Sequence, residues 1–316
     1  MSEIFKYSHT DFSCDELPDL KKGRKIYTVF STFGERERDL VIEKIAVLKK
    51  LPPGIIDRII INHRRTGNSP DRTETGISSL YKDVEIFISN DIKVPDMDAE
   101  KGKGADMRRT LYRINTMYTG VAAPENIVIV FLDSDVLPRF FGDHFVTALA
   151  GAVLRGADFA KAGFWREMGR VTKYVSRPLF SLIDHPLLKN LTGFSYPLSG
   201  ECAATLEFFN SMSFSQIYGV ETGILIQSVS GNYSLADVNL GLYDHEHHND
   251  LSIQKMSFGI IRAYFRALID LGIISLSEGA EISDTFSMEY ISSASERVRF
   301  TELLEEKMYR PLKEII

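Results

Sequence analysis

The apolar run from 125 to 132, ENIVIVFL, constrains the fold of this chain more than any other segment. A short, nearly continuous apolar run is typical of a strand that is buried on both faces of a parallel or mixed sheet. The run leads directly into Asp133-Ser134-Asp135. We therefore predict a central strand, with two carboxylates at the point where that strand leaves the core.

Strands and helices alternate before this run. The segments that predict strands are 26–30, 55–61 and 84–89. Apolar residues at helical spacing predict helices over 35–50 and around 107–118, and the polar segment 62–76 predicts a loop. This alternation indicates an α/β fold, in which ligands bind beyond the carboxyl ends of the strands. Neither a G-x-G-x-x-G nor a P-loop motif follows the first strand, which argues against those two phosphate-binding classes.

The remaining segments define the ends of the fold. Residues 1–23 are polar and lack periodicity, so we predict an N-terminal arm. Strand-like segments follow the central strand at 158–164 and 235–242. From about residue 253, apolar residues at helical spacing predict a helix that serves as core or dimer contact. A second, charge-rich helix is predicted from about 294 to 310.

The charge balance and the cysteines exclude several classes of protein. Lys and Arg number 37 and Asp and Glu 43, which gives a formal net charge of −6, whereas nucleic-acid binders normally carry a basic surface. Cys14 and Cys202 lie far apart, so neither a disulfide framework nor a structural zinc site is predicted. The most apolar long stretch, 145–154, is too short to span a membrane, and no export signal is visible. We predict a soluble cytoplasmic protein with no nucleic-acid partner and no membrane span.

The Asp133-Ser134-Asp135 segment is a candidate metal site. Residues i and i+2 of an extended segment project to the same side, so two carboxylates can converge on one hard cation. Such an ion keeps positions for water and a diphosphate, which suits an enzyme whose leaving group is a nucleoside diphosphate. The alternative is a solvated acidic pair that caps the next element.

Several short motifs stand in a fixed order around this segment. They are GKG (102–104), GRVT (169–172), RPL (177–179), PLSGE (197–201), YGVETG (218–223) and VNLGLYDHEHH (238–248). Together with the DSD segment they resemble the glucosyl-3-phosphoglycerate synthases of glycosyltransferase family 81, over roughly residues 24 to 250. The resemblance implies a retaining enzyme with a GT-A fold: an α/β protein whose mixed, Rossmann-like, nucleotide-sugar-binding sheet is flanked by helices.

The resemblance also implies a division of the chain. Residues 24–150 form the nucleotide-sugar-binding half of the GT-A core, and residues 151–252 form the acceptor-binding half. Residues 253–316 form a helical tail that is expected to contribute a dimer contact, and so a homodimer is predicted.

For the metal, the resemblance implies that Asp135 and His245 are ligands of Mg²⁺ or Mn²⁺, with Asp133 nearby toward the nucleotide ribose. An imidazole beside a carboxylate and a diphosphate suits Mn²⁺ in particular. The histidine cluster also admits a zinc site as an alternative. Because no cysteine lies nearby, His247 and His248 are interpreted as solvated loop residues.

The resemblance places the donor-binding residues at Glu35, Lys103, Asp133, Ser134, Ser199 and Gly200. Lys103 is assigned to neutralise charge that develops on the diphosphate, and Glu35 to lie near the nucleotide base. Glu221 is assigned to the transferred sugar, where a carboxylate can support an oxocarbenium-like transition state. The alternatives are a surface lysine at 103 and a first-turn helix charge at 35.

The acceptor side is implied to be Gly169, Arg170, Val171 and Thr172. An arginine can hold a phosphate through two hydrogen bonds, and backbone amides beside the glycine can cradle its oxygens. The alternative is an ordinary loop with an exposed arginine. Tyr243 departs from the family pattern, because it stands where an acceptor-side arginine is common.

The predicted reaction moves a hexose, glucose in the first instance, from a UDP- or GDP-sugar to the 2-hydroxyl of 3-phosphoglycerate. No nucleophile is assigned, and substitution on the same face of the sugar is expected. The segment Asn62-His63-Arg64-Arg65 replaces the family's usual Asp-x-Gly-Ser, which leaves UDP and GDP open. Alternative functions are transfer from GDP-mannose, transfer to another phosphorylated acceptor, or non-catalytic binding of a nucleotide sugar.

Overall fold

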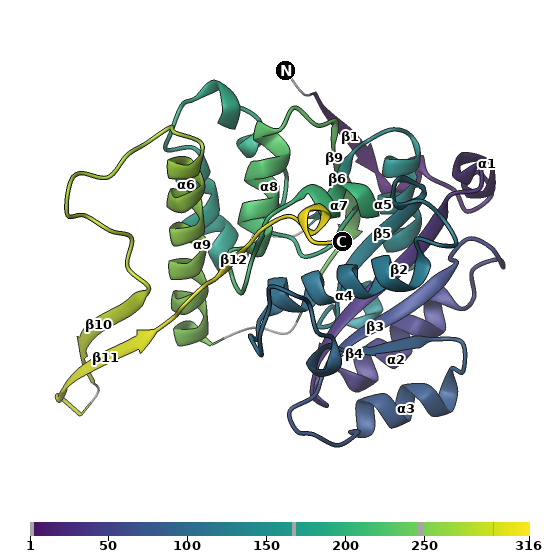
Figure 1. Cartoon of the computed structure of the whole chain (residues 1–316), viewed down its shortest axis with the longest axis horizontal. Helices are drawn as coiled ribbons and strands as arrows, with labels where there is room; N and C mark the ends of the chain where they lie inside the picture. Colours follow the sequence, from purple (N-terminus) through teal and green to yellow (C-terminus); the bar gives the residue numbers. More distant parts are fainter. Residues whose placement is uncertain (1–2, 166–168, 246–248, 293) are drawn as a thin grey trace.

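The computed structural model of the chain is built around one eight-stranded sheet (Figure 1). It describes residues 3–165, 169–245, 249–292 and 294–316. The strand order is β1-β9-β6-β7-β5-β2-β3-β4. All neighbours are parallel except β7, which runs antiparallel to β5 and to β6. The predicted α/β class with a mixed sheet flanked by helices is confirmed.

Six of the eight strands of this sheet overlap the predicted segments, and β1 and β7 were not predicted. The eight strands are β1 (Ile4–Ser8), β2 (Lys25–Phe33), β3 (Arg58–Arg64), β4 (Glu85–Ile88), β5 (Ile127–Asp133), β6 (Phe159–Trp165), β7 (Cys202–Thr205) and β9 (Leu235–Leu242). The described helices are α1 (Leu17–Lys21), α2 (Arg38–Leu48), α3 (Arg72–Leu80), α4 (Lys103–Tyr118), α5 (His144–Leu154), α6 (Arg177–Phe180), α7 (Leu206–Ser211), α8 (Val220–Ser230) and α9 (Asp250–Asp270). In the strand order, β5, β2, β3 and β4 make up one half of the sheet, and β1, β9, β6 and β7 make up the other.

The central strand β5 is buried on both faces, as its apolar run predicts. Ile127, Ile129 and Phe131 face a core that is closed by α4, α7, α8 and α9. The alternate residues Val128 and Val130 face a second core, closed by α2, α3 and α5. Since side chains of a strand alternate between faces, one continuous apolar run supplies both cores.

The carboxyl ends of three parallel strands lie side by side. Ser31 at the end of β2 is in register with Asp133 of β5 on one side and with Asn62 of β3 on the other. Neighbouring strands in a sheet are about 4.8 Å apart. The acidic end of β5 and the polar ends of β2 and β3 therefore form one continuous edge.

The prediction of an N-terminal arm is wrong for residues 4–8. They form β1, the edge strand of the sheet, which pairs in parallel with β9 from Ile4 opposite Leu235 onward. Lys6 also forms an ion pair with Asp237 at 2.9 Å. An edge strand that is only partly buried carries no continuous apolar run, so no local pattern predicts it.

The C-terminal tail differs from its prediction in its second half. The first helix is confirmed as α9, but the helix predicted from 294 to 310 is wrong. Strands β10 (Thr285–Ile291) and β11 (Arg297–Leu303) form an antiparallel hairpin that projects beside α9 (Figure 1). Every second residue of β11 is partly buried, which is a strand period that its many charges obscured. The chain then forms β12 (Met308–Tyr309), which pairs with β8 (Phe214–Ser215).

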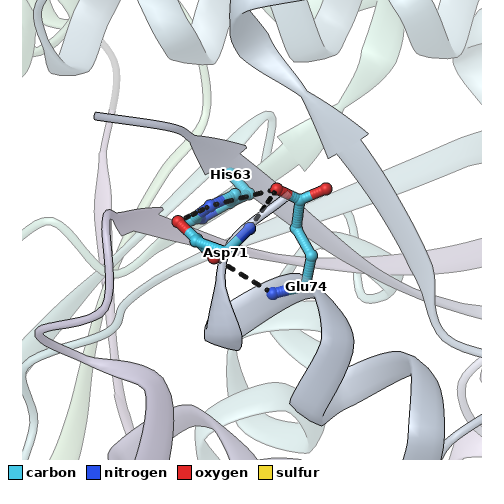
Figure 2. Close-up of side chains that lie close together, drawn as sticks. All are labelled: His63, Asp71 and Glu74. Atoms are coloured by element: carbon cyan, nitrogen blue, oxygen red, sulfur yellow. Dashed lines mark hydrogen bonds and ion pairs between the residues drawn. The ribbon is translucent and has the colours of Figure 1, made fainter. Parts of the chain in front are cut away.

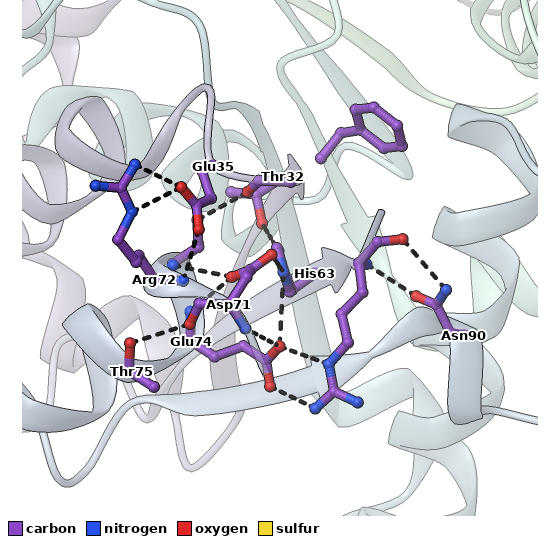
Figure 3. A network of polar contacts seen from close by, with 12 residues as sticks. Thr32, Glu35, His63, Asp71, Arg72, Glu74, Thr75 and Asn90 are labelled. Atoms are coloured by element: carbon purple, nitrogen blue, oxygen red, sulfur yellow. Dashed lines mark hydrogen bonds and ion pairs between the residues drawn. The ribbon is translucent and has the colours of Figure 1, made fainter. Parts of the chain in front are cut away.

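The predicted loop 62–76 is also shorter than expected, because α3 begins within it. The Asp71 side chain accepts hydrogen bonds from the backbone N–H of Thr73 at 2.9 Å and of Glu74 at 3.3 Å. The Glu74 side chain accepts in return from the Asp71 backbone. This capping box starts the helix inside a polar segment (Figure 3).

Among the helices in the described part of the chain, none combines the length and the apolar character that crossing a membrane requires.

Candidate active site

A cavity of about 660 Å³ opens at the carboxyl edge of the sheet. Every site residue predicted from the sequence is described, and all but Glu35 line this cavity. Those that do are Lys103, Asp133, Ser134, Asp135, Gly169, Arg170, Val171, Thr172, Ser199, Gly200, Glu221 and His245. The structure thus brings together side chains from segments that lie far apart in the sequence.

Lys103 is the first residue of α4 and reaches two carboxylates. Its Nζ lies 2.6 Å from Oδ1 of Asp133 and 2.8 Å from Oε1 of Glu221. Gly102 before it has φ +136°, where a side chain is strained, and a Cβ there would overlap the carbonyl oxygen of Gln216. The glycine therefore lets α4 begin close enough for its first side chain to enter the cavity.

The lysine and the carboxylates control one another's protonation. Burial disfavours the charge on Lys103, but Asp133 and Glu221 outweigh burial and hold the pKa of this lysine well above its usual value. Burial also opposes ionisation of Asp133, yet the Lys103 ammonium lowers the pKa of that carboxyl overall. Both groups are therefore charged at neutral pH.

Gly200 lies directly against this ion pair. A Cβ at this position would overlap Oδ2 of Asp133 and Nζ of Lys103. The PLSGE segment can pass this close to the two charged groups only because position 200 has no side chain.

His245 reaches the acidic turn through backbone pairing. An antiparallel bridge joins His245 to Val136, and the N–H of Leu137 donates to the carbonyl of Asp244 at 3.0 Å. These contacts hold the end of the YDH segment beside Asp135. Burial and the charge of Asp133 raise the pKa of the Asp135 carboxyl above its usual value. His247 and His248 lie outside the described residues.

The ligand chemistry of this corner fits a divalent cation held by few protein groups. Asp135 and His245 contribute one carboxylate and one imidazole to the same cavity. Their ligand atoms and that of Asp133 do not all lie within 4.8 Å of one another, since Asp133 turns toward Lys103. The pair Asp135 and His245 would leave most coordination positions to a diphosphate and water.

A tighter cluster of possible ligands lies outside the cavity. Among the described residues, the ligand atoms of His63, Asp71 and Glu74 all lie within 4.8 Å of one another (Figure 2). The carboxylate of Glu74 accepts two hydrogen bonds from Arg65, both at 2.5 Å, while Asp71 caps α3. A cation here would compete with a guanidinium that is already in place, so we interpret the cluster as structural.

The same cluster braces the edge of the cavity. Nδ1 of His63 lies 2.8 Å from Oγ1 of Thr32, a cavity residue, and Nε2 lies 2.9 Å from Asp71 (Figure 3). The network therefore ties the ends of β2 and β3 to the start of α3.

Glu35 does not line the cavity in this structure, and its place at the donor site stays a prediction. Its exposed carboxylate binds Arg72 of α3, with Oε2 2.7 Å from Nε (Figure 3). Glu37, two residues further on, lines the cavity instead. Its carboxylate accepts from the N–H of Phe33 at 3.2 Å, and burial raises its pKa. The turn after β2 decides which of these glutamates faces inward.

The predicted acceptor segment, 169–172, forms part of the cavity wall. Thr172 is buried, and Arg170 is half-exposed and forms an ion pair with Asp250 at the start of α9. The same helix adds Ile253, Met256 and Ile260 to the wall. The helix predicted only as core or dimer contact thus contributes to the cavity itself.

Three buried charged residues beneath the cavity were not predicted. Glu201 accepts from Oγ of Ser199 at 2.8 Å and from the hydroxyl of Tyr243 at 3.4 Å, and burial together with Asp133 raises its pKa to about 7. Lys161 of β6 donates to the carbonyl of Ser199 at 2.6 Å.

The third of these residues is Lys44 of α2, which donates to the carbonyl of Ser134 at 2.6 Å. Burial lowers the pKa of Lys44 to about 8. A sequence signal for it existed, because Lys44 falls at helical spacing among the buried residues Val41, Ile45 and Leu48.

The sequence matches no protein-family model but aligns with curated proteins over most of its length. The glucosyl-3-phosphoglycerate synthase of Mycobacterium tuberculosis (strain H37Rv) is 30% identical over 267 residues, which cover 78% of this chain and 74% of that protein. The glucosyl-3-phosphoglycerate synthase of Petrotoga mobilis is 29% identical over 303 residues, which cover 89% of this chain and 85% of that protein.

Solved structures resemble this fold over nearly the whole chain. One is glucosyl-3-phosphoglycerate synthase from Mycobacterium tuberculosis in complex with Mn²⁺, UDP and phosphoglyceric acid, with a TM-score of 0.76, 25% identity and 96% of each chain covered. Another is mannosyl-3-phosphoglycerate synthase from Rubrobacter xylanophilus, with a TM-score of 0.80, 25% identity, and 99% of this chain and 96% of that chain covered.

Proposed function

The chain belongs to the family of glucosyl-3-phosphoglycerate synthases, and on that basis we propose that it is a metal-dependent glycosyltransferase of the GT-A fold that moves glucose from UDP-glucose to the 2-hydroxyl of 3-phosphoglycerate. The observation that carries this proposal is the convergence of Lys103, Asp133 and Glu221 in one cavity beside Asp135. A related enzyme binds Mn²⁺, UDP and phosphoglyceric acid together. The cavity, at about 660 Å³, is in the range of ligand-binding pockets.

We assign the metal ion to Asp135 and His245, which suit Mg²⁺ or Mn²⁺. When bound, the ion stabilises negative charge on the departing diphosphate. The two side chains leave positions for diphosphate oxygens, so metal and donor bind as a unit.

We assign the donor to the same edge of the cavity. Lys103 neutralises charge on the leaving diphosphate, and Asp133, which Lys103 holds ionised, accepts a hydrogen bond from the ribose. Ser134, Ser199 and Gly200 line the path between the diphosphate and the sugar. On the nucleoside side, we assign Glu35, as the sequence predicts, together with Glu37, which lines the cavity.

Glu221 is assigned to the transferred glucose. Its carboxylate stays in the cavity through its ion pair with Lys103. A negative charge at this position stabilises positive charge that develops on the sugar ring, while the lysine stabilises the opposite charge on the leaving group. One ion pair thus serves both ends of the bond that breaks.

The acceptor is assigned to the wall formed by 169–172. Arg170 and the backbone amides beside Gly169 bind the phosphate of 3-phosphoglycerate. The acceptor hydroxyl then attacks the sugar from the face that the diphosphate leaves, and a phosphate oxygen of the leaving group accepts its proton. The α-configuration of the donor is retained in the product.

A mannosyl donor is the second candidate. The similarity to a mannosyl-3-phosphoglycerate synthase over 99% of this chain favours it. Asn62, near the end of β3, lines the cavity at a position where the sequence departs from the family's usual pattern. Its side chain is the group that we expect to contact a different nucleotide base.

We also propose a homodimer in the cytoplasm, where a nucleotide sugar and phosphoglycerate are both present. The β10–β11 hairpin supports the dimer, because it projects from the rest of the chain (Figure 1) and exposes Tyr290 and Ile291 near one end and Leu303 at the other. Analytical ultracentrifugation tests this assignment.

The reaction is tested by following release of nucleoside diphosphate. UDP-glucose, GDP-glucose and GDP-mannose are each supplied with Mn²⁺, with and without 3-phosphoglycerate. We expect UDP-glucose to be consumed only when both phosphoglycerate and Mn²⁺ are present, and chelation to stop the reaction. Turnover of GDP-mannose alone would favour the mannosyl function, and nucleotide binding without turnover would favour a non-catalytic protein.

A further inference from the structure

Lys44 lies below the floor of the cavity and is fully buried. It occupies the inward face of α2, among Val41, Ile45 and Leu48. Its ammonium donates to the carbonyl oxygen of Ser134 at 2.6 Å and to that of Asp133 at 3.4 Å. A lysine on the apolar face of a helix therefore contacts the backbone of the acidic turn above it.

This ammonium has no close carboxylate partner. Within the described part of the chain, Lys44 forms no ion pair within 4.0 Å, and the ring of Phe141 lies 5.9 Å from Nζ. More distant carboxylates act on its charge, those of Asp135, Glu201, Asp133 and Glu37. Burying a charged group without a paired charge is costly, so a neutral apolar side chain would normally be preferred here. The cost is offset by the hydrogen bonds that Lys44 donates to the two backbone carbonyls of the turn.

Three contacts hold the turn formed by residues 133–136, and the hydrogen bond from Lys44 to the Ser134 carbonyl is one of them. The Ser134 hydroxyl donates to the carbonyl of Ser31 in β2. On the far side, Val136 pairs with His245. Because Ser134 stands between the two aspartates, fixing its carbonyl fixes the directions in which their carboxylates point.

We propose that Lys44 is a positioning residue for the metal site: by holding the carbonyl of Ser134, it keeps Asp135 turned toward His245. The inference rests on the proposed function, in which these two residues bind Mg²⁺ or Mn²⁺. Lys44 itself contacts no substrate and is not a catalytic residue.

Two neutral variants separate positioning from charge, because Lys44→Met and Lys44→Gln both remove the ammonium and only Lys44→Gln keeps a hydrogen-bond donor. An effect of charge alone would change Mn²⁺ binding equally in both variants. Removing the support of the Ser134 carbonyl lets the turn move, which weakens Mn²⁺ binding. Residues that orient metal ligands typically change metal affinity by about 10- to 100-fold when they are mutated.

The test is a titration of the metal-free protein with Mn²⁺ alone, in which free Mn²⁺ is followed by electron paramagnetic resonance. Lys44→Met keeps an unbranched side chain, one heavy atom shorter than lysine, and removes the charge and the hydrogen bonds. We expect its Kd for Mn²⁺ to rise by about tenfold or more. An unchanged or lower Kd overturns the inference.

Lys21→Met is the matched control. Lys21 is also buried and donates to two successive backbone carbonyls, those of Gly54 at 2.6 Å and Ile55 at 3.3 Å, neither of which lines the cavity. Unlike Lys44, it also forms an ion pair with Asp57 at 2.5 Å, so its loss is a stringent control for destabilisation. Both variants are expected to lower the Tm, whereas only Lys44→Met is expected to weaken Mn²⁺ binding. An equal loss of Mn²⁺ affinity in both variants would show a general effect of destabilisation and overturn the positioning role.

Two further outcomes keep the inference separate from the proposed function. If Lys44→Met does not fold, Lys44→Gln is measured instead. It retains a donor, so its Kd for Mn²⁺ is expected to rise by a smaller factor than that of Lys44→Met, and an unchanged Kd overturns the inference.

If the wild-type protein itself fails to bind Mn²⁺, the proposed metal site fails and the inference with it. Wild-type binding that Lys44 variants leave unchanged contradicts the inference alone.

Discussion

The backbone of Val136 pairs with the backbone of His245 in an antiparallel bridge. The pairing joins the residue after Asp135 to a residue that lies just beyond the end of β9 at Leu242, far along the chain. An aspartate and a histidine thereby line one cavity without being close in sequence. The metal site that we propose depends on this bridge.

Asp135→Asn should abolish metal-dependent turnover. The amide keeps the size of the side chain but removes the charge that binds the ion, so we expect kcat/KM to fall by at least about 100-fold. Mn²⁺ titration and turnover are measured on the same sample. The control is Asp158→Asn, which alters an aspartate outside the cavity and should leave Mn²⁺ binding and turnover unchanged. Normal Mn²⁺-dependent turnover of Asp135→Asn would contradict the assignment of Asp135 as a metal ligand.

Lys103→Met should lower kcat more than it changes the KM for phosphoglycerate. The variant removes the cation that faces the leaving diphosphate, and loss of one such group typically costs about 100-fold or more in kcat. It also leaves Asp133 and Glu221 without the ammonium between them. Lys103→Arg, which keeps the charge, should recover part of kcat. Equal activity of the Met and wild-type proteins would contradict the role given to this lysine.

Gly200→Ala should weaken donor binding. The added methyl group overlaps Asp133 and Lys103, so the ion pair must move, and such overpacking costs about 1–3 kcal/mol. We expect the KM for UDP-glucose to rise about tenfold or more. Gly120→Ala, where a Cβ meets no atom within 4 Å, is the control, and similar donor KM values for the two variants would contradict the predicted overlap.

Glu201→Gln should change how stability depends on pH. Burial and the charge of Asp133 raise the pKa of Glu201 to about 7 in the folded protein, from an ordinary value of 4.5. Between these values the folded state keeps a proton that the unfolded state releases, so the contribution of Glu201 to stability is present below pH 4.5 and is lost as the pH rises through 7. The difference is up to about 3 kcal/mol, at about 1.4 kcal/mol per pKa unit.

The glutamine variant carries no titrating proton at this position. Its free energy of unfolding relative to wild type should therefore be higher at pH 8 than at pH 5, as measured by urea denaturation at both values. Glu207→Gln changes an exposed glutamate of α7 and serves as the control. A difference between Glu201→Gln and wild type that does not vary with pH would exclude a raised pKa.

The sheet was predictable where burial leaves a clear pattern. Strand β5 is buried on both faces, and its apolar run marked both the strand and the acidic turn that follows. Strand β1 is partly exposed and depends on pairing with β9, which no local pattern encodes. The β10–β11 hairpin was mistaken for a helix because charged residues occupy the exposed positions of its alternation.

The site was predictable as a set of residues but not as a set of contacts. Motif order identified Lys103 and Glu221 separately, whereas their ion pair requires α4 and α8 to meet across the cavity. The ion pair of Glu35 was not predictable, because its partner Arg72 comes from the start of α3, which was expected to be a loop. The burial of Lys44 was predictable from its helical spacing, but its contacts were not, because its partners are backbone carbonyls, which any residue carries.

The most direct test of the central claim is proton NMR of the product formed from UDP-glucose, 3-phosphoglycerate and Mn²⁺. The account predicts a new anomeric signal of an α-glucoside, with the glucose linked to the 2-hydroxyl of 3-phosphoglycerate, and no such signal when the metal is chelated. A β-glucoside, or free glucose and UDP with no glycosyl-phosphoglycerate, would contradict it.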